Sequence, residues 1–168
     1  VGRLEKSKDQ ITILKAINLI KNKIPLKLII IGYGSQRIYL QNFIKQNSLS
    51  STVKIVFSKK PDYFYKKSDL FILSSKYEGF GNVLIEAASY NIPIISSRSG
   101  GPIEILSNGK LGKLFEVGDF RKLSSLIYNF YKKQDIKSID KKFLNKYSIS
   151  NLNKYNSIFK NIWIYFTI

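Results

Sequence analysis

Short runs of consecutive apolar residues alternate along this chain with longer segments in which apolar residues recur every three or four positions. The runs have the length of β-strands, and the longer segments have the spacing of one helix face. The runs do not alternate with polar residues, which is typical of strands buried on both faces of a parallel sheet. This order predicts repeated βαβ units. The predicted strands are the end of one at residues 1–3 and those at 26–31, 53–57, 70–73, 92–96 and 111–115.

From residue 119 onward only helical patterns occur. The predicted helices cover residues 9–22, 36–46, 61–66, 83–90, 120–132, 139–145 and 150–162. Asp9 is a candidate N-cap for the first of them, and Pro61 can open the third. We therefore predict one α/β domain over residues 1–168, a Rossmann-like, doubly wound parallel sheet of about six strands with helices on both faces. A helical tail at residues 119–168 follows the sheet.

The composition removes several kinds of chemistry. The 168 residues include no cysteine, histidine or methionine, so disulfides, thiolate catalysis and histidine general bases are excluded. The net charge of +17 favours anionic partners, but the stronger explanation is compositional drift, because the Lys-, Ile- and Asn-rich sequence is typical of proteins encoded by AT-rich genes. Because the chain begins with valine, we interpret it as a fragment of a longer protein.

The block from Glu78 to Glu86 is the most informative motif. It places two glutamates eight positions apart, with a Gly-x-Gly turn and a helix start between them. Glycines let a backbone approach a ligand closely, and amides at a helix N-terminus can hold an anion. We expect Glu78 in the loop above the site and Glu86 one turn into the helix. The alternative is a capped helix with two ordinary surface glutamates, but the glycines at a strand-to-helix junction favour a site.

Other candidate residues follow the predicted strands, where open parallel sheets bind ligands. Arg3 and Lys8 come after the first strand, and a guanidinium beside an ammonium suits a diphosphate. In a chain with 28 lysine and arginine residues, two cations in one loop can also be a consequence of composition alone. The Gly-Gly-Pro turn at residues 100–102 predicts either an anion-binding nest or a structural turn.

Cofactor motifs are incomplete or missing. Gly32 and Gly34 begin a dinucleotide fingerprint, but its third glycine is missing, which makes a nicotinamide cofactor a weak prediction. There is no phosphate-binding P-loop and no Asp-x-Asp pair to hold Mg²⁺ or Mn²⁺. The charge of a diphosphate would then be met by Arg3, Lys8 and helix amides.

Together these motifs resemble the C-terminal, donor-binding domain of a retaining GT-B glycosyltransferase of family 4. The matching segments follow the family's order over nearly all of residues 1–162. They are residues 1–4, 8–9, 31–34, 69–75, 77–87, 93, 100–102, 104–105 and 147–148. The chain departs from the family at Tyr33, where a small polar residue is usual, and at residues 88–91, a stretch that often ends in glycine.

The resemblance implies one half of a GT-B fold that binds a nucleotide-diphospho-sugar, preferably a UDP-sugar. It implies metal-independent, configuration-retaining transfer to a glycan or lipid-linked acceptor, with no cofactor. Glu78, Arg3 and Lys8 would act in catalysis, Glu86 would hold the ribose, and residues 57–60 would border the base. The implied donor-binding set is Arg3, Lys8, Gly34, Glu78, Gly79, Phe80, Gly81, Asn82, Val83 and Glu86.

The resemblance also implies a bacterial hexosyl or N-acetylhexosaminyl transferase of polysaccharide biosynthesis. Such an enzyme would be cytoplasmic, with peripheral contact to the inner face of the membrane and no nucleic-acid partner. Its acceptor domain would lie N-terminal to this chain in the same protein, so the isolated chain would bind donor but transfer little sugar. Two alternatives remain. One is a different enzyme with a GT-B-like fold, such as a sugar-nucleotide epimerase or a phosphorylase relative, and the other is a non-catalytic cationic module for polyanions.

Overall fold

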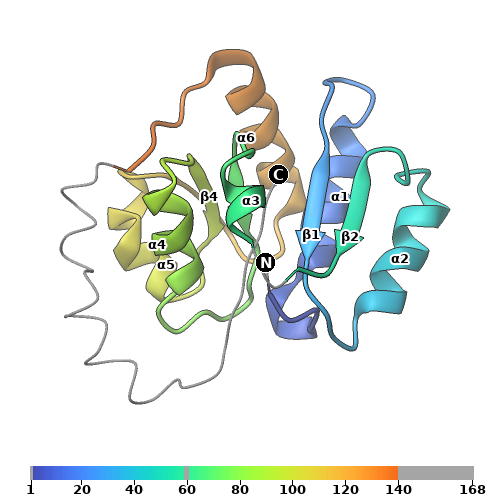
Figure 1. The fold of residues 1–168 in the computed structure, drawn as a ribbon. Coiled ribbons are helices and arrows are strands. Elements are labelled where there is room, and N and C mark those ends of the chain that lie inside the picture. Colours follow the sequence, from blue (N-terminus) through green and yellow to red (C-terminus); the bar gives the residue numbers. More distant parts are fainter. Residues whose placement is uncertain (1, 59–60, 140–168) are drawn as a thin grey trace.

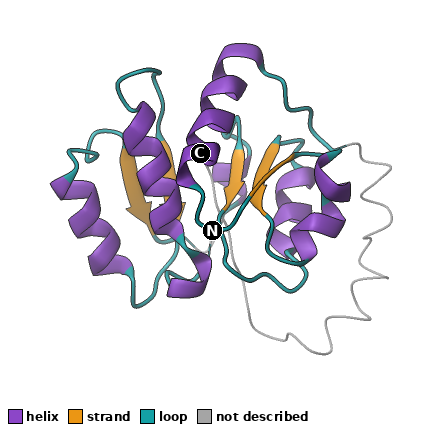
Figure 2. Cartoon of the chain, turned by 180° about the vertical axis from the view of Figure 1, so that it is seen from behind, coloured by secondary structure: helices purple, strands orange, loops and turns teal. Residues whose placement is uncertain are grey.

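The computed structural model describes residues 2–58 and 61–139, and Figures 1 and 2 show it from opposite sides. Within this part, the strands form two parallel sheets. In the first, β1 (Leu28–Ile31) pairs with β2 (Val53–Val56), with Leu28 opposite Val53. In the second, β3 (Phe71–Leu73), β4 (Ile94–Ser97) and β5 (Lys113–Phe115) lie in that order. The α/β class and the parallel strands are as predicted.

The helices separate the strands in the predicted order. They are η1 (Lys6–Lys8), α1 (Gln10–Ile20), α2 (Arg37–Gln46), α3 (Asp62–Tyr65), α4 (Asn82–Ser89), α5 (Gly101–Ile105), η2 (Ser107–Gly109) and α6 (Phe120–Lys133). Asp9 precedes α1 as predicted, but its side chain makes no hydrogen bond to a backbone amide of the helix. Its Oδ2 instead accepts a hydrogen bond of 2.8 Å from the Thr12 hydroxyl.

The single sheet of about six strands is not what the structure shows. The described strands fall into sheets of two and three. The amides of Gly2 and Leu4 donate to the carbonyls of Ile31 and Tyr33 at 3.0 and 2.7 Å, so residues 2–4 lie beside the end of β1 without forming a ladder of their own. Of the predicted tail, α6 is present. Ile139 is buried in an irregular segment, and the remaining predicted helices and the motif at residues 147–148 lie outside the described residues.

One hydrophobic core joins the two sheets. α1 packs against α6, and α6 also contacts β5, so this helix pair connects the halves of the domain. Leu14 and Ile17 of α1, Leu28 of β1, Phe71 of β3 and Leu123 of α6 are all buried in the same cluster. No helix among the described residues is long and apolar enough to cross a membrane.

Candidate functional site

An ion pair between Lys8 and Glu78 marks the centre of the site. The Lys8 ammonium lies 2.8 Å from Glu78 Oε2, and the hydroxyl of Ser75 donates to the same oxygen at 3.1 Å. The two side chains are only 12% and 15% exposed. The pair thus brings together a cation and a carboxylate that the sequence placed seventy positions apart. The structure thus brings two of the predicted site residues into contact.

Hydrogen bonds between the segment around Lys8 and the segment before Glu78 fix the position of this ion pair. The amide of Lys76 donates to the carbonyl of Ser7 at 2.8 Å. The buried hydroxyl of Ser74, at the end of β3, lies 3.0 Å from the carbonyl oxygens of both Lys8 and Asp9. Because β3 is fixed in the core, these contacts set the position of η1. Ser74 and Ser75 directly follow the apolar strand within a segment that matches the family, but the sequence assigned neither of them a role in the site.

The glycine-rich loop after Glu78 packs against a second glycine turn. Glu78 donates its amide to Ser99 at 2.9 Å and accepts from the amide of Gly101 at 3.0 Å. A Cβ atom on Gly101 would lie 2.3 Å from the carbonyl oxygen of Phe80. Because the Gly101 amide already donates to Glu78, it is not available to an anion in the predicted nest. The close packing of Gly101 favours the alternative of a structural turn for this segment.

We predict that Gly101→Ala lowers the free energy of unfolding by about 1–3 kcal/mol, the usual cost of overpacking. The added methyl group has no room against two backbone carbonyls, so residues 78–80 must move. Urea unfolding checks this. Gly79→Ala is the matched control, because nothing lies within 4 Å of a Cβ at that position. Equal losses in both variants would contradict the packing argument.

The N-terminus of α4 follows this loop. Gly81 adopts a left-handed conformation with φ of 87°, and the helix begins at Asn82. The first amides of a helix have no partner within it, so those of Asn82 and Val83 are available to an anion. The Val83 side chain is buried in the core, which leaves only its backbone for a ligand. Phe80 is half-buried and packs against the same core.

Glu86 lies one turn into α4, as predicted, and its surroundings shift the pKa of its carboxyl. Burial raises the pKa of its carboxyl to about 7, while the hydrogen bond from the Tyr65 hydroxyl, at 3.1 Å, acts in the opposite direction. Asp62 adds a small repulsion. Tyr65 is itself buried and stacks on Tyr90 with ring centroids 5.2 Å apart. Tyr65 was missed because only the tertiary structure brings α3 to α4.

Arg3 and Gly34 make contacts that do not involve the Lys8–Glu78 pair. The Arg3 guanidinium lies 3.1 Å from Glu5 Oε1, and its side chain is 47% exposed. Gly34 has a φ of 147°, and a Cβ there would come within 2.6 Å of the Leu4 carbonyl oxygen. Close packing against the backbone of Leu4 therefore explains the glycine at position 34. Contact of either residue with a donor remains a prediction.

Two exposed aromatic rings stand at the carboxyl ends of β1 and β2. Tyr33 and Phe57 are 63% and 58% exposed, and their rings meet edge to face with centroids 5.8 Å apart. Phe57 begins the segment expected to border a nucleobase, of which residues 59–60 lie outside the described part. Tyr33 is one of the two places at which the sequence departs from the family pattern.

The parallel strands and the helices between them place this chain in the class of Rossmann-like α/β domains. The N-terminus of α4 and the Lys8–Glu78 pair lie at the carboxyl ends of its strands. The family model "Glycosyl transferases group 1" matches residues 1–147, and the chain belongs to this family. This agrees with the resemblance drawn from the sequence at the level of the family group.

Two curated relatives illustrate the similarity. The chain is 32% identical over 132 residues to the 2-deoxystreptamine N-acetyl-D-glucosaminyltransferase of Niallia circulans, covering 76% of this chain and 34% of that protein. It is 31% identical over 132 residues to the capsular polysaccharide biosynthesis glycosyltransferase CapM of Staphylococcus aureus, with the same coverage of 76% and 34%. The chain thus spans about a third of the length of these relatives.

Among solved structures, the Anabaena protein HepE in complex with UDP and glucose superimposes with a TM-score of 0.80 at 20% identity. The match covers 93% of this chain and 45% of that one. At this identity the likeness establishes the fold, which is that of a GT-B glycosyltransferase domain.

Proposed function

We propose that this chain is the donor-binding half of a retaining family 4 glycosyltransferase and that it binds a nucleotide-diphospho-sugar. The observation that carries the proposal is the Lys8–Glu78 pair beside the free amides of α4, with Glu86 one helical turn beyond. An ammonium has three donors. One is directed at Glu78, so two remain for a diphosphate.

The proposed mechanism uses the charges of the chain itself. When the bond between the sugar carbon and the diphosphate oxygen breaks, negative charge develops on the departing diphosphate. Lys8, Arg3 and the N-terminal amides of α4 stabilise that charge, and no metal ion is required. Glu78, held by Lys8 and Ser75, faces the transferred sugar. Retention of configuration is part of the proposal through the family resemblance.

We further propose a UDP-sugar donor carrying a hexose or N-acetylhexosamine. The residues from Asn82 to Glu86 resemble those of family members that use UDP-N-acetylhexosamines. The structurally similar HepE was solved with UDP and glucose, and the Niallia relative is named as an N-acetylglucosaminyltransferase. In this arrangement Glu86 accepts hydrogen bonds from the ribose hydroxyls, and the base lies near Phe57.

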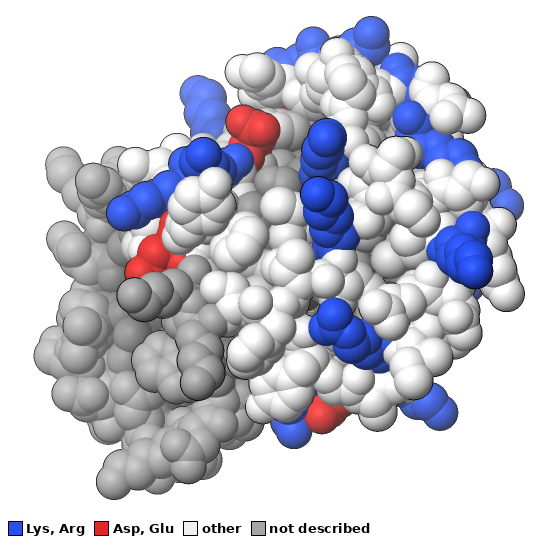
Figure 3. Space-filling view, turned by 45° about the vertical axis from the view of Figure 1, so that its right-hand side comes forward, with Lys and Arg blue, Asp and Glu red and all other residues white. Residues whose placement is uncertain are grey.

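The acceptor side of the proposal follows from the relatives. CapM is named for capsular polysaccharide biosynthesis, which supports a glycan or lipid-linked acceptor in a bacterial surface polysaccharide pathway. We place the enzyme in the cytoplasm, in peripheral contact with the membrane. Lysine and arginine side chains outnumber acidic ones on the face shown in Figure 3, which supports attraction to anionic lipid. Acceptor binding and efficient transfer need residues beyond this chain.

A thermal-shift panel tests the nucleotide proposal. We expect one of UDP, GDP and ADP, or its sugar conjugate, to stabilise the chain by about 2.7 kcal/mol at 100 times its dissociation constant. The same ligand should give a much smaller shift with Glu86→Ala, because the ribose loses its acceptor. Glu104→Ala, which removes an exposed glutamate of α5, is the matched control. Absence of any nucleotide shift in the wild type would overturn the proposal.

A further inference from the structure

Tyr65, at the end of α3, is a buried tyrosine whose hydroxyl meets a carboxylate of the proposed donor site. The residue is only 1% exposed, and its hydroxyl donates to Glu86 Oε2 at 3.1 Å. A buried tyrosine hydroxyl needs a hydrogen-bond partner. Here that partner is the acid proposed to hold the ribose, so the contact has a consequence beyond the core.

The Tyr65 ring is held on two sides, which fixes the direction of its hydroxyl. It stacks on Tyr90 with ring centroids 5.2 Å and ring planes 15° apart. Phe71 of β3 lies on it at a tilt, with centroids 6.2 Å apart. Since β3 is part of the core, the hydroxyl is a donor fixed by packing rather than a mobile side-chain end. Rigid support of this kind is what keeps a binding group in its productive geometry.

The hydrogen bond restricts the orientation of a side chain that would otherwise rotate freely at its end. A carboxylate offers about four acceptor positions, so one taken by Tyr65 leaves about three. The two hydroxyls of a ribose need two of these. Tyr65 therefore fixes the plane of the Glu86 carboxylate without using up its capacity to accept from a ligand.

We propose that Tyr65 is a positioning residue that holds the Glu86 carboxylate where it accepts from the ribose hydroxyls and thereby sets the preference for a ribonucleotide over its deoxy analogue. The inference rests on the proposed function, because it takes Glu86 as the acceptor for the ribose. Tyr65 acts through Glu86 and makes no contact of its own with the nucleotide.

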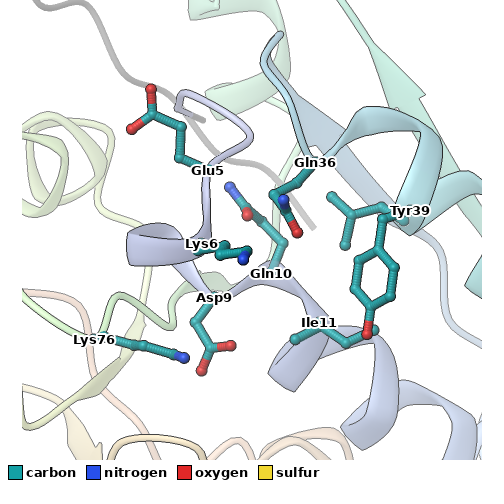
Figure 4. Close-up of a pocket in the computed structure, with 9 residues that line it drawn as sticks. Glu5, Lys6, Asp9, Gln10, Ile11, Gln36, Tyr39 and Lys76 are labelled. Atoms are coloured by element: carbon teal, nitrogen blue, oxygen red, sulfur yellow. The ribbon is translucent and has the colours of Figure 1, made fainter.

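The cavity of about 360 Å³ in the other half of the domain is the alternative place for a nucleotide. Its walls come from η1, the first turns of α1 and α2, and Lys76 of the loop after β3 (Figure 4). Neither Tyr65 nor Glu86 lines it. A nucleotide bound there would be insensitive to both side chains, so variants of Tyr65 also test where the nucleotide binds.

Calorimetric titration with UDP and with dideoxy-UDP, which lacks both ribose hydroxyls, measures the preference. We expect the wild type to bind UDP at least about tenfold more tightly, because the hydroxyls donate to a charged group. Tyr65→Phe keeps the ring and removes the hydroxyl. It should lower the preference by about threefold or more and leave the affinity for dideoxy-UDP unchanged. In a Glu86→Ala background, the added Tyr65→Phe should change nothing, since a positioning residue acts only through its partner.

The pH profile of stability gives a second readout that a merely structural tyrosine would not move. Burial raises the pKa of Glu86, and the Tyr65 hydrogen bond lowers it. Without that bond the pKa lies higher still, so the loss of stability on ionisation of Glu86 should shift to higher pH in Tyr65→Phe. Asp62, an acid of α3 that also raises this pKa, is unchanged in the variant.

The matched control is Tyr90→Phe, which removes the other hydroxyl of the stacked pair. That hydroxyl is hydrogen-bonded to Asp62 and not to Glu86. The control should keep both the wild-type preference and the wild-type pH profile. The proposal is overturned if UDP binds but the wild type shows no preference, if Tyr65→Phe equals the control, or if Tyr65→Phe weakens both nucleotides equally. If UDP does not bind to the wild type at all, the donor proposal itself fails, and this inference fails with it.

Discussion

Replacing Lys8 with alanine is expected to weaken the binding of UDP by about 10- to 100-fold, because hydrogen bonds to charged groups contribute about 1.5–3 kcal/mol. The Lys8 ammonium is the least exposed cation of the site and is held in place by Glu78 at 2.8 Å. It therefore meets the diphosphate with little loss of side-chain freedom. Uridine lacks the diphosphate, and its affinity should change little.

The same substitution leaves Glu78 without its cation in a largely buried position, which destabilises the fold. Lys8→Ala/Glu78→Gln removes the orphan charge. The double variant should regain much of the lost stability yet keep the defect in UDP binding. Lys45→Ala, a change of equal charge at the end of α2, is the control for long-range electrostatics. UDP binding by Lys8→Ala equal to that of this control would show that Lys8 does not contact the diphosphate.

Glu86→Gln is expected to remove a fall in stability that the wild type shows between pH 5 and pH 8. Burial raises the pKa of Glu86 from 4.5 to about 7. Between these values the folded chain holds a proton that the unfolded chain releases, so the free energy of unfolding decreases as the pH rises. At 1.36 kcal/mol for each pKa unit, the total effect is about 3 kcal/mol at most. The sequence has no histidine, which leaves this pH range unusually free of other titrating side chains.

Urea unfolding at pH 5, 6, 7 and 8 measures this effect. Glu86→Gln should match the wild type near pH 5 and exceed it in stability at pH 8, since glutamine needs no ionisation. Glu104→Gln, the same replacement at an exposed position of α5, should keep the wild-type slope. A wild type whose stability rises from pH 5 to pH 8 would contradict a protonated, buried Glu86.

The pH dependence of UDP binding follows with the opposite sign. A carboxylate accepts hydrogen bonds from both ribose hydroxyls, whereas the protonated acid has lost part of that capacity. The affinity of the wild type should therefore rise more steeply from pH 6 to pH 8 than that of Glu86→Gln, in which only the terminal phosphate of UDP titrates. Because stability and affinity move in opposite directions, one titration of Glu86 accounts for both.

The order of strands and helices was predictable because local patterns determine it. The run at residues 28–31 has no polar position, and β1 is buried as that pattern indicated. The glycine-rich junction before Asn82 predicted the start of α4 to within one residue. The split into two sheets was not predictable. It depends on whether neighbouring backbones meet along their length. Residues 2–4 donate one hydrogen bond to Ile31, the last residue of β1, and one to Tyr33 beyond it.

For the site, too, the sequence and the tertiary structure contributed different information. The sequence by itself determined the class of domain and the family group, and it predicted Lys8, Glu78 and Glu86 as candidate site residues, because motif spacing and residue type are local properties. Only the tertiary structure decided that Lys8 pairs with Glu78, that Tyr65 donates to Glu86 and that Gly101 serves packing. Each of these contacts joins different βαβ units. Pairing across units is set by the packing of the core, which no local pattern in the chain records.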